Sequence, residues 1–170
     1  MKHSGRTIKQ RLYGLTKLPG MFARARYFRG HGVHSPYIYS IVRHVFMKSK
    51  LSDSNQELYD KLLSIAIPKR RAVELQNLFH HCNYKSFALD ESVKCDMLIL
   101  TELTSDNETI TLVNEASKNR GTVIVMYPHS CRERSQLCES LIESHSSTTV
   151  DNRCYLIIFN NHLPKQHFKL

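Results

Sequence analysis

Apolar residues recur at helical intervals at the start of the chain. A short basic amphipathic helix is expected first, with apolar positions Ile8, Leu12 and Leu15, and it should end near Leu18 because Pro19 and Gly20 follow. Ser35 and Pro36 predict the start of a second helix, because a serine hydroxyl caps free amides and proline suits the first helical position. This helix should bury one face, made of Ile38, Ile41, Val42, Val45 and Phe46.

Two more helices are expected before residue 83. Ser54 and Glu57 have the spacing of a capping box, in which each side chain bonds the other residue's backbone amide. The helix they predict should end before Pro68 and carry the apolar stripe Leu58, Leu62 and Ile65. The next helix should cover Arg70 to Cys82, with Ala72, Leu75, Leu78 and Phe79 pointing inward.

Beyond Asn83 short apolar runs alternate with helical patterns, which predicts an α/β sheet. The runs predict strands at 86–90, 96–100, 122–127, 148–150 and 154–159. Ser105 and Glu108 predict a helix that begins with a capping box, ends before Gly121 and points Ile110, Val113 and Ala116 inward. Ser130 with Glu133 predicts another, carrying Leu137 and Leu141. The pair Asp151-Asn152 suits a tight hairpin, so the sheet should close with an antiparallel ribbon.

Composition narrows the class of protein. The 170 residues, 41% hydrophobic and 23% charged, are enough for one globular domain plus an arm, and no apolar run approaches the roughly 18 residues of a membrane span. Five cysteines at irregular spacing favour reduced thiols, and therefore a cytoplasmic protein.

Charge divides the chain at residue 50. Residues 1–50 hold 11 Lys and Arg and no Asp or Glu, whereas residues 51–170 carry a net charge of −2. We therefore expect a basic helical arm over 1–50 and an α/β domain over 51–170. Such asymmetry is typical of proteins that bind a polyanion, such as nucleic acid, or an anionic membrane surface. A solubilising segment and an organellar transit peptide are the alternatives.

The sequence lacks the usual motifs of nucleotide binding and hydrolysis. No glycine occurs between Gly32 and Gly121, so the glycine-rich loops of ordinary Rossmann and P-loop sites are missing. There is no G-x-S-x-G turn. The residues His80, His81, Cys82, His129 and Cys131 match no standard zinc spacing, and Cys82, Cys138 and Cys154 suit a core. No catalytic, cofactor-binding or metal-binding residue is therefore predicted from these motifs.

The segment from His31 to Pro36 is the most unusual local motif. Two histidines three residues apart, His31 and His34, stand beside a predicted helix N-terminus. They suit binding of an anion, transfer of a proton, or simple capping of the helix entrance. Together with basic residues of the arm they form the expected contact set for an anion or partner: Lys9, Arg11, Arg24, Arg26, Arg29, His31 and His34.

The sequence also resembles a known family at both ends. Arg29-Gly-His-Gly-Val-His-Ser-Pro-Tyr37, Tyr155-Leu-Ile-Ile-Phe159 and Leu163-Pro-Lys-Gln-His-Phe-Lys169 are similar to the opening motif, last strand and closing motif of one group of proteins. These are bacterial, mainly Bacteroidetes, class I S-adenosylmethionine-dependent methyltransferase-like proteins. Residues 96–100 and 122–126 resemble the fourth and fifth strands of that sheet. The resemblance covers residues 27–50 and, more loosely, 70–170, and it implies a Rossmann-like sheet.

The cofactor-binding half of that family has no counterpart in this sequence. Residues 87–91 stand where the family has an acidic, glycine-rich turn after its first strand, yet they contain no glycine. Thr101 stands where the family has an aspartate, and Tyr127-Pro128 stands where it has an acidic pair. Only Glu91 to Cys95 separate the first two predicted strands, fewer than the dozen residues of an ordinary parallel crossover. We therefore expect the first strand to be antiparallel, displaced or lost, in a shortened, remodelled sheet.

Three functions follow from these observations. The first is a non-catalytic, degenerate methyltransferase-like protein that binds a polyanion such as RNA through its basic arm, or that forms a homodimer across the sheet edge exposed by the deletion. The second is a methyltransferase that binds S-adenosylmethionine in an unconventional way. The third is a membrane-surface protein that uses residues 6–29 as a basic amphipathic anchor.

Overall fold

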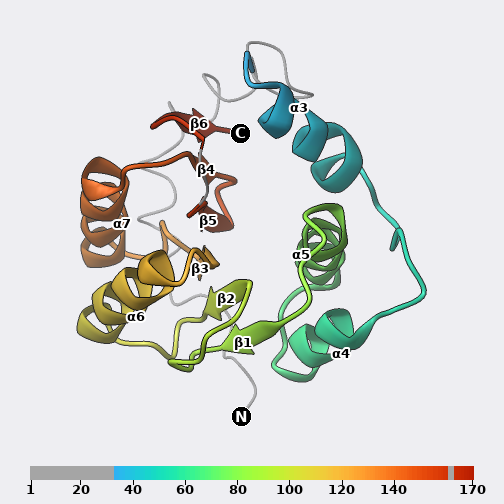
Figure 1. Cartoon of the computed structure of the whole chain (residues 1–170). Coiled ribbons are helices and arrows are strands. Elements are labelled where there is room, and N and C mark those ends of the chain that lie inside the picture. Colours follow the sequence, from blue (N-terminus) through green and yellow to red (C-terminus); the bar gives the residue numbers. More distant parts are fainter. Residues whose placement is uncertain (1–32, 161–162) are drawn as a thin grey trace.

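A six-stranded mixed sheet lies between two layers of helices (Figure 1). The computed structural model describes residues 33–160 and 163–170, so the helix expected near residues 8–18 lies outside the described residues. The strands are β1 (Phe87–Leu89), β2 (Met97–Leu100), β3 (Thr122–Met126), β4 (Thr149–Asp151), β5 (Tyr155–Ile158) and β6 (His167–Lys169). The helices are α3 (Pro36–Ile41), the π-helical turn η2 (Val42–Phe46), α4 (Glu57–Ser64), α5 (Lys69–His81), α6 (Asp106–Lys118) and α7 (Arg132–Ser144).

The strand order is β1-β2-β3-β5-β4-β6. β1, β2 and β3 are parallel, whereas β5 runs antiparallel to both β3 and β4. The predicted α/β, Rossmann-like class is confirmed, and so is the antiparallel hairpin of β4 and β5. The last strand, β6, extends the sheet beyond that hairpin by pairing parallel to β4.

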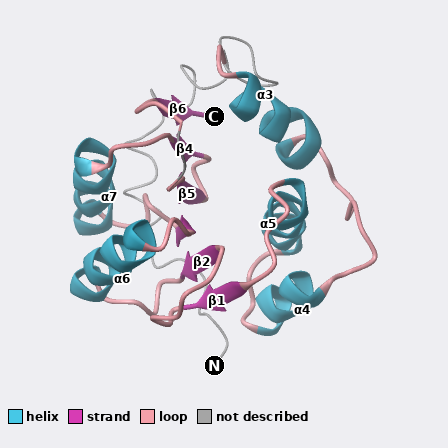
Figure 2. Ribbon diagram, viewed as in Figure 1, coloured by secondary structure: helices cyan, strands magenta, loops and turns pink. Residues whose placement is uncertain are grey.

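Alternate residues of the central strands enter two separate cores. Met97, Ile99, Ile124 and Met126 pack with α3, η2, α4 and α5 on one face. Leu98, Leu100, Val123 and Val125 pack with α6 and α7 on the other face. Figure 2 shows these two helical layers on opposite sides of the sheet. Because both faces are covered, the central strands β2, β3 and β5 are largely apolar runs without polar alternation.

The apolar faces of most predicted helices are confirmed, with one error in α6. Ile38, Ile41 and Val45 are fully buried, so the end of the basic segment shares the core of the α/β domain. Ile110 was expected to point inward, but 41% of it is exposed. The buried face of α6 is instead Thr109, Leu112, Val113 and Ala116, which repeat at three- and four-residue intervals.

Two of the four predicted N-caps form as expected. The Ser35 hydroxyl accepts a hydrogen bond from the Ile38 amide, and Ser105 and Glu108 form a complete capping box. The other two predictions are wrong. The Asn55 side chain, rather than Ser54, accepts from the Glu57 amide at the start of α4. The Cys131 thiol, rather than Ser130, accepts from the Arg134 amide at the start of α7.

The expectation that the first strand is antiparallel, displaced or lost is wrong, because β1 pairs parallel to β2. β1 has only three residues, so the seven-residue connection over 90–96 must return past roughly 10 Å of strand. Seven residues span up to about 25 Å, which is sufficient. The connection passes beside α6, where the Ser92 hydroxyl donates to the Glu115 carboxylate. A helical crossover is therefore unnecessary.

Candidate functional site

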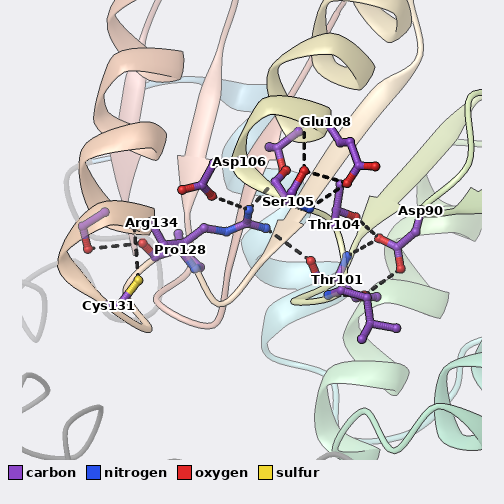
Figure 3. A network of polar contacts seen from close by, with 12 residues as sticks. Asp90, Thr101, Thr104, Ser105, Asp106, Glu108, Pro128, Cys131 and Arg134 are labelled. Atoms are coloured by element: carbon purple, nitrogen blue, oxygen red, sulfur yellow. Dashed lines mark hydrogen bonds and ion pairs between the residues drawn. The ribbon is translucent and has the colours of Figure 1, made fainter. Parts of the chain in front are cut away.

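The carboxyl ends of β1, β2 and β3 form the edge at which ligands bind in open Rossmann-like sheets. Asp90 follows β1, Thr101 follows β2, and Tyr127-Pro128 follows β3. The N-termini of α6 and α7 meet the same edge, since each helix follows one of these strands. Figure 3 shows the polar side chains that gather there.

The Asp90 carboxylate bridges the ends of β1 and β2. Its Oδ1 accepts from the Thr101 amide at 2.6 Å, and its Oδ2 accepts from the Thr101 hydroxyl at 2.6 Å. The Thr104 hydroxyl donates to Oδ1 as well. Thr101 and Thr104 are both buried. Thr101, at the position where the family resemblance expects an aspartate, is thus a hydrogen-bond donor to the acid of the neighbouring strand.

The Arg134 side chain fills the space between α6, α7 and the end of β2. Its guanidinium is buried and donates to the Thr109 hydroxyl at 3.0 Å and to the Thr101 carbonyl at 3.3 Å. It also donates to the Asp106 carboxylate at 3.3 Å. A guanidinium has no acceptor and stays charged, so these three oxygens compensate its burial.

The helix N-termini at this edge are occupied by the chain itself. In α6 the Ser105 hydroxyl caps the Glu108 amide, and the Glu108 carboxylate accepts from the Ser105 amide at 3.0 Å. These bonds to Ser105 lower the pKa of the exposed Glu108 carboxyl. In α7 the cap is the Cys131 thiol. The backbone amides at helix N-termini bind phosphate in nucleotide-binding folds. In α6 and α7 some of these amides already donate hydrogen bonds to side chains of the protein itself.

The backbone at this edge has glycine-like conformations without glycine. Asp90 has a φ of 53° and Tyr127 a φ of 51°, both in the left-handed region. A glycine there would leave space for a phosphate or sugar to approach the main chain. Here each position carries a side chain, and that of Asp90 is hydrogen-bonded to its neighbours. The contacts of the described residues are those of an edge closed by side chains.

A second polar cluster holds α5 against the start of β5. Glu74 is 1% exposed, and its carboxylate accepts from Arg71 at 2.5 Å, from Arg70 at 3.2 Å and from the Tyr155 hydroxyl at 3.0 Å. Burial, and then the charge of Glu74, raises the pKa of Tyr155 well above its ordinary value. A phenol with a raised pKa stays protonated and donates its hydrogen bond, so this cluster acts as a clamp.

The pair His129 and Asp151 joins the ends of β3 and β4. His129 Nε2 lies 2.9 Å from an oxygen of the buried Asp151 carboxylate. An imidazole beside a carboxylate is the base and its orienting group in hydrolytic triads. The other ring nitrogen, Nδ1, is buried and has no hydrogen-bond partner among residues 33–160 and 163–170, so no serine or cysteine of the described chain completes a triad with it.

The histidines and cysteines considered for zinc lie in separate places. His80 contacts Gln76 and the Asn55 carbonyl, whereas His81 stacks on His44. Cys131 caps α7. Over residues 33–160 and 163–170, no three His, Cys, Asp or Glu side chains are grouped so that they could hold a metal ion. Cys138 is buried as expected, and Cys82 and Cys154 are half-buried against the core.

Two cavities lie away from the closed edge. A cleft of about 410 Å³ separates the C-terminal ends of α6 and α7 and is lined by Ser117, Arg120, His145 and Asn160 among others. Two of its lining residues bond each other, since the Ser117 hydroxyl donates to the Asn160 side-chain oxygen at 3.0 Å. A smaller cavity of about 130 Å³ lies between α6 and the β1–β2 connection. Neither is lined by Asp90, Thr101 or Arg134.

The residues expected to contact an anion are mostly outside the described part of the chain. Lys9, Arg11, Arg24, Arg26, Arg29 and His31 lie there, and only His34 is described. His34 is exposed and directly precedes the Ser35 cap. Their role therefore stays a prediction.

The sequence patterns did not identify Arg134, Thr104 or Glu74 as members of polar clusters. One signal was present for Arg134, which lies four and seven residues before the buried Cys138 and Leu141. A charged residue at a core position of a helix indicates a buried ion pair. Glu74 carries the same signal, because it stands within the buried run of α5.

Comparison with models of known protein families finds no match, and comparisons with curated proteins and with solved structures find none either. Among the described residues, no helix has both the length and the apolar character needed to cross a membrane.

Proposed function

We propose that this protein is a non-catalytic, methyltransferase-like binding module whose basic N-terminal segment binds a polyanion, with RNA as the leading candidate. The observation that carries the proposal is the closed sheet edge. Asp90, Thr101, Thr104 and Arg134 bond one another at the place where a Rossmann-like fold would bind a nucleoside. The absence of glycine between Gly32 and Gly121 supports the same conclusion.

The strand arrangement supports descent from a methyltransferase-like sheet. The segments that resemble the fourth and fifth strands of that family are β2 and β3, which are parallel neighbours. The segment that resembles the last strand is β5, which lies beside β3. The resemblance and the pairing agree in these elements, while the glycine-rich half has no counterpart.

Charge supports a polyanionic ligand. Residues 1–50 contain 11 Lys and Arg and no Asp or Glu. In the described part of this segment, Arg43, Lys48 and Lys50 are exposed, whereas Ile38 and Ile41 face the core. Cations on the solvent side can contact phosphates without disturbing the fold. Five cysteines without a disulfide support a cytoplasmic location, where RNA is present.

The first experiment is an anisotropy titration of the full chain with a labelled single-stranded RNA across a series of salt concentrations. An arm variant replaces Arg24, Arg26 and Arg29 with glutamine. A matched control replaces Lys85, Lys94 and Lys118, which are exposed cations of the α/β domain. Each lost phosphate contact lowers affinity about fivefold at about 0.1 M salt, so the arm variant should bind about 100-fold more weakly.

Affinity that is absent, insensitive to salt, or lowered equally by the arm variant and the control would overturn RNA binding by the arm. Sedimentation with anionic vesicles tests the membrane alternative under the same conditions. The non-catalytic part of the proposal has a separate test. Calorimetry with S-adenosylhomocysteine should give no heat of binding, whereas micromolar affinity would show a usable cofactor site.

A further inference from the structure

We propose that the α/β domain carries a second basic surface, at the carboxyl edge of β4 and β6, that binds the phosphate backbone of the same RNA. This basic edge consists of Lys69, Arg70, Arg132, Arg153 and Lys169, all of them exposed. The inference rests on the proposed function, because it assigns a further contact surface to the same ligand. It differs from that function in using residues outside the N-terminal segment.

Hydrogen bonds and strand pairing at Asp151 bring the backbones of three of these cationic residues to the same end of the sheet. Arg153 lies in the β4–β5 turn, and its amide donates to the Asp151 carboxylate at 2.8 Å. Lys169 is the register partner of Asp151 on β6. The contact between His129 and Asp151 draws the segment before α7 to the same place, and Arg132 is the first residue of that helix.

The N-terminus of α5 reaches this edge through the Glu74 clamp. Tyr155, at the start of β5, donates to Glu74, and Arg70 pairs with the same carboxylate. The Arg70 side chain is nevertheless 72% exposed, so it can contact a ligand as well. Lys69 precedes it as the first residue of α5 and is also exposed.

The acids of this region do not cancel its charge. Glu74 and Asp151 are buried and already paired, with Arg70 and Arg71 in one case and with His129 in the other. The remaining acid, Glu133, is exposed beside Arg132. With Arg71 included, the described part of this region has six cationic and three acidic side chains, and two of the three acids are buried.

The other half of the same sheet edge has the opposite sign. Glu91, Glu102, Asp106 and Glu108 are all exposed near the carboxyl ends of β1 and β2, and the cation among them, Arg134, is buried. A polyanion is therefore attracted to the β4–β6 half and repelled from the β1–β2 half. This polarity sets where a phosphate backbone can lie on the domain.

The chemistry of the basic edge favours RNA over a lipid surface. Peripheral membrane binding uses apolar side chains that enter the bilayer beside the cations. The large exposed apolar residues of the described chain are Tyr39, Met47, Leu63, Val93, Leu103 and Ile110. None of them belongs to the segments that form the basic edge. Cations without apolar anchors suit phosphates that remain in water.

The experiment adds an edge variant to the salt titration with single-stranded RNA. It replaces Arg132, Arg153 and Lys169 with glutamine and leaves Arg70 and Arg71 to hold Glu74. The control is again Lys85, Lys94 and Lys118, which lie toward the opposite edge of the sheet, at the start of β1, in the β1–β2 connection and at the end of α6. Circular dichroism confirms that each variant is folded.

Loss of three contacts should lower affinity about 100-fold at about 0.1 M salt and reduce the slope of log affinity against log salt by about 2. The control variant should change both the affinity and the salt slope by much less. If the edge variant binds like the control while the arm variant loses affinity, the basic edge is refuted and the proposed function stands. If the edge variant alone loses affinity, the basic edge is confirmed and binding by the arm is refuted. Absence of RNA binding by the unmodified chain overturns both.

Discussion

The carboxylate of Asp90 should contribute more to stability than its half-buried position suggests. It accepts hydrogen bonds from the Thr101 amide, the Thr101 hydroxyl and the Thr104 hydroxyl. Hydrogen bonds to charged groups contribute about 1.5–3 kcal/mol each to stability. When a buried amide loses its acceptor, the folded state also bears the full desolvation penalty of that amide. The two hydroxyls can rotate toward other partners, so we assign them about 0.5–1 kcal/mol each. Replacement by alanine should therefore remove about 3–4 kcal/mol of hydrogen bonding.

Backbone conformation adds a separate cost. Asp90 has a φ of 53°, which aspartate tolerates better than alanine, and left-handed geometry costs an alanine about 1 kcal/mol. Asp90→Ala should thus lower the free energy of unfolding by about 4–5 kcal/mol. Asp90→Gly should lower it by about 3–4 kcal/mol, because glycine adopts this φ without strain. Asp90→Asn keeps one acceptor for the Thr101 amide and should lose about 1–2 kcal/mol.

Urea denaturation of the three variants measures these differences, provided that the slope m stays constant. A loss below about 0.5 kcal/mol for Asp90→Ala would contradict the interpretation of the sheet edge, because surface substitutions without a structural role have effects of that size. The edge would then be free to open. If Asp90→Ala and Asp90→Gly were equally stable, the conformational part of the reasoning would be refuted while the hydrogen-bonding part stood.

Two further predictions concern the opposite edge of the sheet. Gly121→Ala would place a Cβ 2.6 Å from the Cys95 carbonyl oxygen and should lower the free energy of unfolding by about 2 kcal/mol. The control Asn119→Ala should change the free energy of unfolding by less than about 0.5 kcal/mol. Equal losses for the two variants would contradict the close contact at Gly121. The hydrogen bond from the Lys85 amide, followed by the other hydrogen bonds to Asp96, lowers the pKa of the Asp96 carboxyl below its ordinary value of 3.8. The stabilisation by Asp96 is therefore present above pH 3.8 and is lost as the pH falls through the lower pKa of the folded state. The stability difference between the unmodified chain and Asp96→Asn should therefore shrink in denaturation series as the pH falls below 3.8, and a constant difference would refute the assignment.

Periodicity predicted most of the elements, because a buried face repeats at fixed intervals along a helix or strand. The N-caps were harder to predict. Any Ser-x-x-Glu segment satisfies the capping-box pattern, but an adjacent residue can occupy the cap instead. Cys131 does so before α7, one residue after the predicted serine. Before α4 the N-cap position is Gln56, and the Asn55 side chain accepts from the Glu57 amide in place of Ser54.

The candidate site was predictable in position but not in its contacts. The apolar runs placed Asp90 and Thr101 at the ends of two strands. Their contact depends on the parallel register of β1 and β2, which the short connection led us to reject. The partners of Arg134 come from α6 and the end of β2, 25 or more residues away along the chain, so local spacing contains no signal for them.

The unusual connection between β1 and β2 also affects how the protein folds. Partners in this parallel pair are only ten residues apart, as with Phe87 and Met97, whereas β2 and β3 partners are 25 residues apart. Closing a ten-residue loop takes about 10–100 ns, and its entropic cost is lower than that of a longer loop. Parallel strands ordinarily associate late because their contacts are distant in the chain. Here the chain can begin its sheet from a local nucleus at β1 and β2.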